Sequence, residues 1–251
     1  MFKRLAAPAM LAATIAMAPV SADAAVIGYF GANAGASITA SGHTPQQLAN
    51  LTAGHLAGID VLWIFNPNNG NPSATILNNL ANIDAFVSGG GVLSFHDRNV
   101  AQGTVDANQY LPGGAAISFT TFLSANIDVV TPGTLVTNGP GGVINNTTLD
   151  GGNFSNHGWA AVASLPVGAV PIFNNGNAGQ IVDFYYGHGG GHVYYSTIPL
   201  DFYLNGGTAF RTVYAPNEAA FQASLTAVPE PGTLALLGLG LVGLVRSRKR
   251  A

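Results

Sequence analysis

Two short apolar runs flank one helical pattern, and this arrangement constrains the fold more than any other feature of the chain. The runs are Val61–Phe65 (VLWIF) and Val92–Phe95 (VLSF). Continuous rather than alternating hydrophobicity predicts strands that are buried on both faces. Between them, Ser73–Ser88 predicts a helix, with Ser73 as its N-cap and Gly89–Gly91 as its stop. Its apolar residues follow the 3.6-residue spacing of a helix: Ile76, Leu77, Leu80, Ile83, Phe86 and Val87. Such a unit predicts parallel strands and a right-handed crossover.

The rest of the chain predicts more strands and two further helices. A strand is expected at Ala25–Phe30, followed by a loop, and Thr44-Pro45 predicts the start of a short helix through Leu51. The later strand candidates are Leu135-Val136, Ala161–Leu165, Val170–Phe173, and a hairpin of Ile181–Tyr186 with His192–Thr197. Glu218–Leu225 predicts a closing helix. We therefore expect an α/β fold, a three-layer sandwich with a mixed, partly parallel sheet.

The C-terminus combines three unlike features in a fixed order. Pro229, Glu230 and Pro231 precede an apolar run over residues 232–245, and a cationic cluster follows it: Arg246, Arg248, Lys249 and Arg250. A helix of that length falls short of the ~30 Å hydrocarbon core of a bilayer, but long cationic side chains can extend a short span by reaching the headgroups. The run therefore predicts a short transmembrane helix. A buried core helix is the alternative.

The N-terminus predicts export. Residues 1–24 have a charged start, an apolar stretch and the small-residue pattern Ala22-Asp23-Ala24, which together indicate a secretory signal peptide. An uncut N-terminal anchor is the alternative. In either case residues 25–227 form the exported body, and residues 228–251 form the C-terminal tail.

This order of features resembles the PEP-CTERM family of bacterial exported proteins. The resemblance covers the tail and agrees with the N-terminal signal. It implies that the tail is a sorting signal, processed near the PEP motif by an exosortase-type membrane enzyme. It also implies that the body is held at the inner membrane, at least transiently and on its periplasmic side, before it reaches the envelope or the exopolysaccharide matrix.

Charge and cysteine content exclude several classes of function. The body keeps two of the eight Lys and Arg, namely Arg98 and Arg211, and nine of the eleven Asp and Glu, so its formal charge is −7. A body of that charge is unsuited to nucleic-acid phosphates. The chain has no cysteine, which removes disulfides, thiolate metal ligands and a Cys nucleophile. We expect no cofactor.

The body is similar in its order of elements to the class I glutamine amidotransferase-like fold, including trehalose-utilisation-type relatives. The similarity rests on the strand, helix and strand described above and on the later segment GGGHVYYSTIPLDFYLNG. In active amidotransferases the strand that corresponds to Val92–Phe95 leads into a turn that carries Cys. Here that place reads His96-Asp97-Arg98, so glutaminase chemistry is not expected.

Three groups of residues are candidates for chemistry in the body. His96, Asp97, Arg98 and Asn99 follow a predicted parallel strand, at the edge where α/β sheets place ligands, and His96 is a candidate general base. The alternative is that Asp97 pairs with Arg98 and His96 caps the strand. His188 and His192 could bind a metal with Asp183 or Asp201, although the glycines between them suit a solvated loop equally.

The third group is Ser155, His157 and Trp159, near Asp150. His157 is a candidate for a Ser/His/Asp arrangement, and Trp159 could stack on a sugar ring, although half burial in the core would also explain it. No catalytic set is complete in the sequence. We therefore expect a non-enzymatic exported protein. The alternatives are a degenerate amidotransferase-like hydrolase or metal-dependent enzyme, and a carbohydrate-binding module.

Overall fold

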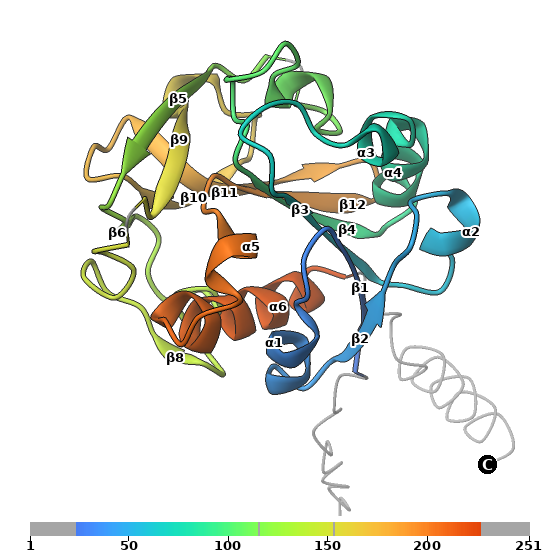
Figure 1. Cartoon of the computed structure of the whole chain (residues 1–251), viewed down its shortest axis with the longest axis horizontal. Helices are drawn as coiled ribbons and strands as arrows, with labels where there is room; N and C mark the ends of the chain where they lie inside the picture. Colours follow the sequence, from blue (N-terminus) through green and yellow to red (C-terminus); the bar gives the residue numbers. More distant parts are fainter. Residues whose placement is uncertain (1–23, 115, 153, 227–251) are drawn as a thin grey trace, which may run out of the picture.

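The two predicted apolar strands lie side by side near the centre of a large mixed sheet, and the predicted helical segment packs on one face of that sheet (Figure 1). The computed structural model describes residues 24–114, 116–152 and 154–226. Within these residues ten strands form one sheet, and two short strands, β7 (Asn138–Gly139) and β8 (Gly142–Val143), form a separate ladder. The strands of the main sheet are β1 (Val26–Phe30), β2 (Thr44–Gln47), β3 (Val61–Asn66), β4 (Val92–Asp97), β5 (Phe119–Ser124), β6 (Asp128–Val129), β9 (Asn156–Ala161), β10 (Val170–Asn174), β11 (Gln180–His188) and β12 (Gly191–Ser196).

The sheet has a parallel half and an antiparallel half. Strands β2, β1, β3, β4 and β12 lie side by side in that order and run parallel. Strands β11, β10 and β6 continue the sheet in antiparallel pairing, while β9 pairs with β11 and also with β5. The predicted mixed, partly parallel sheet is therefore confirmed.

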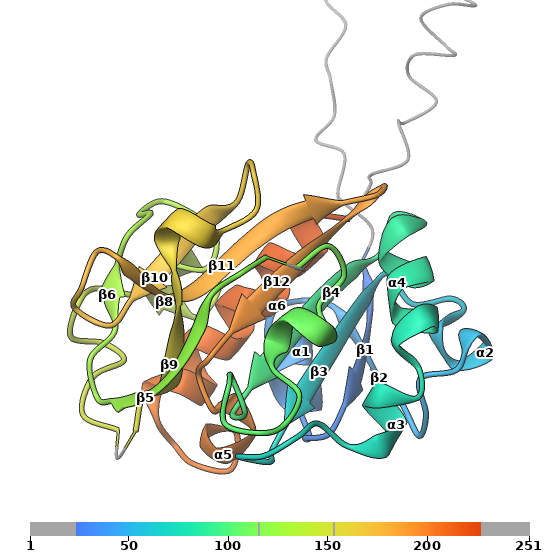
Figure 2. The same cartoon turned by 90° about the horizontal axis from the view of Figure 1, so that it is seen from above.

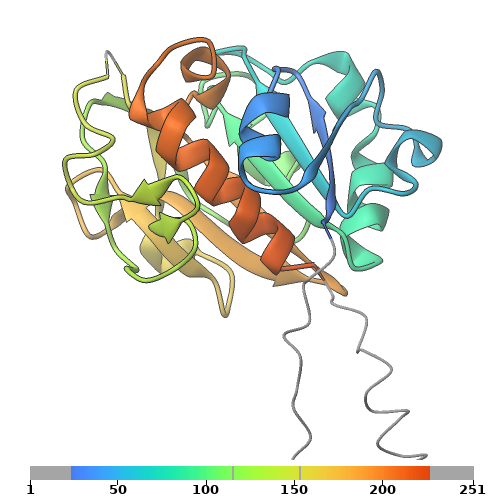
Figure 3. The same ribbon diagram turned by 90° about the horizontal axis from the view of Figure 1, so that it is seen from below.

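Helices cover both faces of the parallel half, which makes a three-layer arrangement. Helices α1 and α6 lie on one face (Figure 3), and α2, α3 and α4 pack on the other (Figure 2). The helices are α1 (Gly35–Ala40), α2 (Ala53–Leu56), α3 (Ala74–Leu77), α4 (Leu80–Ser88), α5 (Leu200–Tyr203) and α6 (Ala215–Ser224), with the 3-10 turns η1 (Ala107–Gln109) and η2 (Val162–Ser164) and the π turn η3 (Phe210–Tyr214).

Strand β3 shows why its sequence is continuously apolar. Val61, Trp63 and Phe65 point into the core beneath α1 and α6, whereas Leu62 and Ile64 point into the core beneath α3 and α4. Successive side chains of a strand point to opposite faces, and both faces here are covered. The prediction of strands buried on both sides is confirmed.

The predicted helix over Ser73–Ser88 is two helices. Ser73 caps α3 as predicted, because its Oγ accepts a hydrogen bond from the Ile76 backbone N–H at 3.4 Å. The helix is then interrupted at Asn78-Asn79, and α4 begins at Leu80. The Asn79 side chain donates to the Thr75 carbonyl at 2.8 Å, and an amide that bonds backbone in this way competes with the helical ladder.

Other predicted elements are confirmed with small shifts of their ends: the first strand as β1, Val170–Phe173 as β10, the hairpin as β11 and β12, and the closing helix as α6. Three predictions were wrong. The expected helix over Thr44–Leu51 begins as the edge strand β2, where Pro45 needs no ladder donor. Leu135-Val136 lies in a turn, and Ala161–Leu165 is mostly the turn η2. Both apolar pieces are too short for periodicity to separate strand from turn.

The described chain begins and ends near the amino ends of the parallel strands. The Val26 backbone N–H, at the start of β1, donates to Asp60 Oδ2 at 2.7 Å, and Thr226 lines a surface hollow together with Asp60 and Gly89–Gly91. The predicted signal peptide, the PEP motif and the predicted membrane helix over 232–245 lie outside the described residues. Within the described residues no helix has the length and apolar character to cross a membrane.

The glycines of the segment GHGGGH let the tip of the β11–β12 hairpin approach the end of α4. The Gly190 N–H donates to the Ser88 carbonyl at 2.9 Å. A Cβ on Gly191 would lie 2.0 Å from the Gly91 carbonyl oxygen and 2.5 Å from the Val87 carbonyl oxygen. Backbone oxygens cannot move aside as a flexible side chain can, so this position requires glycine.

Gly191→Ala should destabilise the body, because the added methyl group forces the hairpin and α4 apart. We expect a loss of about 1–3 kcal/mol in the free energy of unfolding, measured with urea. Gly187→Ala is the matched control in the same hairpin, since its Cβ would meet its nearest atom at 4.0 Å. Equal stability of the two variants would contradict this packing.

Candidate functional site

The end of β4 directs two neighbouring titratable side chains into different cores. His96 points toward α6, and Asp97 points to the opposite face of the sheet, toward Tyr110 and Tyr195. Both side chains are almost fully buried. The structure therefore does not bring His96 and Asp97 together as a catalytic pair.

Asp97 organises the loop that follows β4. Its carboxylate accepts hydrogen bonds from five donors: the Asn66 amide and the backbone N–H groups of Asn99 and Val100, each at 2.9 Å, the Tyr195 hydroxyl at 3.0 Å, and the Tyr110 hydroxyl. Burial raises the pKa of Asp97, and the hydrogen bonds from these groups oppose that rise. Because its acceptor sites are occupied, Asp97 positions the loop rather than a ligand.

The loop after β4 is also tightly held. Val100 is buried with a φ of 54°, an uncommon conformation for a β-branched residue. Gly158 makes room for it, since a Cβ there would lie 2.8 Å from Val100 Cγ1. Asn99, a candidate ligand residue in the sequence, donates to the Val105 carbonyl and accepts from the Gly103 N–H, each at 2.6 Å. Its side chain is occupied within the loop.

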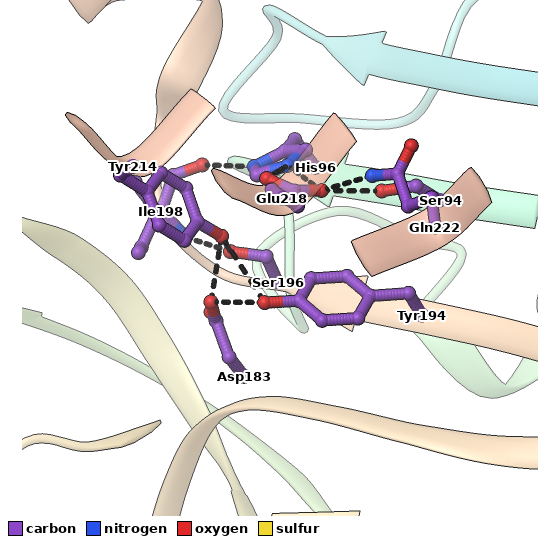
Figure 4. A network of polar contacts seen from close by, with 9 residues as sticks. All are labelled: Ser94, His96, Asp183, Tyr194, Ser196, Ile198, Tyr214, Glu218 and Gln222. Carbon is purple, nitrogen blue, oxygen red and sulfur yellow. Dashed lines mark hydrogen bonds and ion pairs between the residues drawn. The ribbon is translucent and has the colours of Figure 1, made fainter. Parts of the chain in front are cut away.

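His96 forms a buried ion pair with Glu218 of α6 (Figure 4). His96 Nε2 lies 2.8 Å and 2.9 Å from the two carboxylate oxygens, and its Nδ1 lies 3.1 Å from the Ile198 carbonyl. Both ring nitrogens thus face acceptors, which the doubly protonated imidazolium satisfies. Burial acts to lower the pKa of His96, but the nearby Glu218 carboxylate, with help from Asp183 and the Ile198 carbonyl, outweighs it and the pKa is raised.

Ser94 and Gln222 complete the coordination of the Glu218 carboxylate. The Ser94 hydroxyl donates to Glu218 Oε1 at 2.7 Å, and the Gln222 amide, one helical turn along α6, donates to the same oxygen. Ser, His and Glu occur together here, but Ser94 bonds the carboxylate rather than the imidazole. All three side chains have at most 1% of their surface exposed. This arrangement fastens α6 to the sheet and offers no path for a substrate.

A second buried acid, Asp183 on β11, lies beside this cluster (Figure 4). Its Oδ2 accepts hydrogen bonds from Tyr194 at 2.8 Å and Tyr214 at 2.6 Å. Burial raises the pKa of Asp183 to about 6, against hydrogen bonds from Ser196 and Tyr214 and the charge of His96, which lower it. The sequence offered Asp183 as a metal ligand, whereas the structure makes it part of this polar network.

A small cavity lies at the carboxyl ends of the parallel strands. Its volume is about 180 Å³, and it is lined by Asn69, Arg98, Phe154, His157, Pro199, Phe202 and Tyr203. Arg98 follows β4 and forms a two-pronged ion pair with Asp201, Nε to Oδ1 at 2.9 Å and Nη2 to Oδ2 at 2.7 Å. The alternative pairing of Arg98 with Asp97 is therefore wrong. Arg98 and His157 are the two predicted site residues that the structure brings to one cavity.

The remaining candidates lie elsewhere. His188 Nε2 is 2.8 Å from Asp84 Oδ1 on α4, and His192 lies across the hairpin ladder from Gly187. Among the described residues no group of three or more His, Cys, Asp and Glu is placed to hold a metal ion. Trp159 is half-buried on β9, opposite Thr120 of β5, and is not among the residues that line the cavity.

The sequence pattern does not predict the buried network that contains Glu218, Tyr214 and Ser94. It also does not predict the cavity residues Asn69, Phe154, Phe202 and Tyr203. One signal is present for Glu218, because it is the single acid of a short helix whose other residues are apolar or uncharged. A lone acid on a buried helix face requires a partner.

Comparison with known proteins separates the tail from the body. Residues 227–250 match the protein-family model described as the PEP-CTERM protein-sorting motif, which confirms the predicted resemblance of the tail. Among curated proteins, none matches the sequence of this chain.

The body resembles several solved structures in fold. Cytoplasmic protein STM3548 from Salmonella typhimurium aligns with a TM-score of 0.52 at 10% identity, over 81% of this chain and 99% of that one. Cytoplasmic protein STM1381 from Salmonella typhimurium LT2 aligns with a TM-score of 0.52 at 9% identity, over 80% and 99%. A ThuA-like protein from Bacteroides uniformis ATCC 8492 aligns with a TM-score of 0.44 at 10% identity, over 80% and 93%. At these identities the two alignments with a TM-score of 0.52 show a shared fold alone, in agreement with the predicted α/β architecture of the body.

Glu218→Ala should cost about 3–5 kcal/mol in the free energy of unfolding, because it leaves a buried His96 and Ser94 without their partner. Urea unfolding measures the loss. Asp84→Ala is the matched control, since it removes the carboxylate of an exposed His–Asp contact and should change stability by less than about 1 kcal/mol. If the two variants lost the same stability, the Glu218 contact would not fasten α6.

The free energy of unfolding should decrease as pH rises through about 6. The pKa of Asp183 is raised from 3.8 to about 6 in the folded protein, so its contribution is complete below pH 3.8 and is lost as pH rises through 6. The loss is on the order of 3 kcal/mol. The raised pKa of His96 acts in the same direction, with a contribution that is present below 6.5 and is lost as pH rises through its folded pKa.

Urea titrations between roughly pH 4.5 and pH 7 compare the wild type with Asp183→Asn. The variant lacks the titrating carboxyl group and should show a shallower decrease. Its lower absolute stability does not affect the comparison, because the slope against pH is the readout. If the free energy of unfolding fell with pH equally in the two proteins, the raised pKa would not belong to Asp183.

Proposed function

We propose that this chain is an exported, non-catalytic protein that its PEP-CTERM signal delivers to the cell envelope or the exopolysaccharide matrix. The observation that carries the proposal is the sorting motif over residues 227–250. An exosortase-type enzyme of the inner membrane would process the chain near Pro229–Pro231. A transmembrane helix over 232–245 would hold the body on the periplasmic side until then.

The placement of the candidate residues supports a non-catalytic body. His96 and Asp97 are enclosed on opposite faces of the sheet, and His157 and His188 belong to two further, separate environments. A hydrolase needs a nucleophile or activated water, a base and a stabilising group around one reacting atom. The residues proposed for the enzyme alternatives do not share such a point.

The net charge of the body leaves its attachment to the membrane to the tail. The body has nine acidic residues and two arginines, which gives a formal charge of −7. One of the arginines, Arg98, is paired with Asp201. A net negative charge opposes adhesion to anionic lipid headgroups, so attachment to the membrane depends on the tail. The tail therefore decides the location of this protein, and the body decides what it contacts there.

Deletion of residues 228–251 should release the body from the envelope fraction into the periplasm or the medium. A matched variant replaces Pro229, Glu230 and Pro231 with alanine and retains the apolar and cationic segments. It should stay in the membrane fraction, because the signal for processing is lost while the span remains. Fractionation with an antibody against the body measures both. If deletion left the distribution unchanged, the sorting proposal would fail.

A further inference from the structure

The cavity at the carboxyl ends of β3, β4 and β12 exposes two large aromatic rings. Phe202 is 59% exposed and Phe154 is 40% exposed, both at its rim. Each ring leaves apolar surface in water, and a ligand that covers this surface gains free energy of binding. Tyr203 fixes the arrangement, since it stacks on Phe210 at 4.1 Å between ring centroids, and its hydroxyl donates to the Phe154 carbonyl at 3.1 Å.

The charges around the cavity cancel. Arg98 and Asp201 form a complete ion pair, with side chains 19% and 10% exposed. Burial, together with the charge of Arg98, lowers the pKa of His157, so its imidazole is neutral near pH 7. An anion would meet Asp201, and a cation would meet Arg98. The cavity thus favours a ligand without net charge.

Polar groups remain available beside the aromatic rings. Asp201 occupies one side of the Arg98 guanidinium, which carries five N–H donors in all. The Asn69 amide is exposed at the same rim and offers both a donor and an acceptor. Aromatic faces next to a few fixed polar groups are typical of sites for small polar ligands.

We propose that this cavity binds one ring of a neutral saccharide. The C–H face of the ring would pack on Phe202 and Phe154, while its hydroxyl groups bond Asn69 and Arg98. The cavity volume of about 180 Å³ lies below the roughly 300–1,000 Å³ of pockets that enclose drug-sized ligands, which suits one ring. The choice of a polysaccharide as the source of the ring rests on the proposed function, whereas the binding of a neutral ring is inferred from the geometry of the cavity alone.

The position of the cavity agrees with this role. The described chain ends at Thr226, beside Asp60 and the amino ends of the parallel strands, and the cavity lies at their carboxyl ends. A strand of six residues, such as β3 or β4, spans about 20 Å. A body held by its C-terminal tail would therefore direct the cavity away from the membrane.

The test uses the full-length protein in a detergent without a sugar headgroup. Saturation-transfer NMR with glucose, galactose, mannose and N-acetylglucosamine as probes should detect saturable binding of at least one, with a Kd on the order of 1–10 mM. Phe202→Ala should weaken that binding at least about tenfold, and Asn69→Ala should also weaken it. Phe122→Ala is the control, because Phe122 is 54% exposed on β5 and outside the cavity.

Three results would overturn the inference. The first is no saturable binding of any of the four sugars, and the second is an equal effect of Phe202→Ala and Phe122→Ala. The third is tighter binding of glucuronate than of glucose, which would show that the site prefers an anion. The NMR assay measures binding to the purified protein and does not involve the sorting pathway. A negative binding result would therefore not affect the sorting proposal, and a negative fractionation result would not affect the binding proposal.

Discussion

The contact between His96 of β4 and Glu218 of α6 joins residues 122 positions apart and lies wholly out of water. Removing two charges from water costs several kcal/mol per ion, and pairing repays this only when the other hydrogen bonds are also made. Here Ser94, Gln222 and the Ile198 carbonyl make them. In a chain that has no cysteine, this polar contact and the two apolar cores supply the stability that disulfides give to many small domains.

The same strand is fixed from its other face by Asp97, and this has a consequence for the cavity. With His96 held beneath α6 and Asp97 held by five donors, the carboxyl end of β4 has little freedom, and the following residue, Arg98, is placed at the rim of the cavity. Asp201 then orients the guanidinium. A preformed site loses less conformational entropy on binding, so the buried acids support the cavity without touching its ligand.

The sequence predicted the parallel unit because its signals are local: apolar runs, 3.6-residue spacing, and a glycine stop. It also placed Arg98 at a ligand-binding edge, since that follows from the direction of a parallel strand. The alternative pairing of Arg98 with Asp97 was wrong, and the contact of Glu218 with His96 was not predicted, because the contacts that Arg98 and Glu218 make join residues more than 100 positions apart. The helix expected over Thr44–Leu51 failed for another reason. Proline suits the first turn of a helix and an edge strand equally, and the neighbouring strand decides between them.

The intact mass of the mature protein, purified from the envelope of the producing cell, tests the central claim most directly. The account predicts a chain that has lost residues 1–24 and also the apolar and cationic segment after the PEP motif. It further predicts that the C-terminal loss disappears in cells that lack the exosortase-type enzyme. A mature chain that still ends at Ala251 in cells with that enzyme would contradict the account.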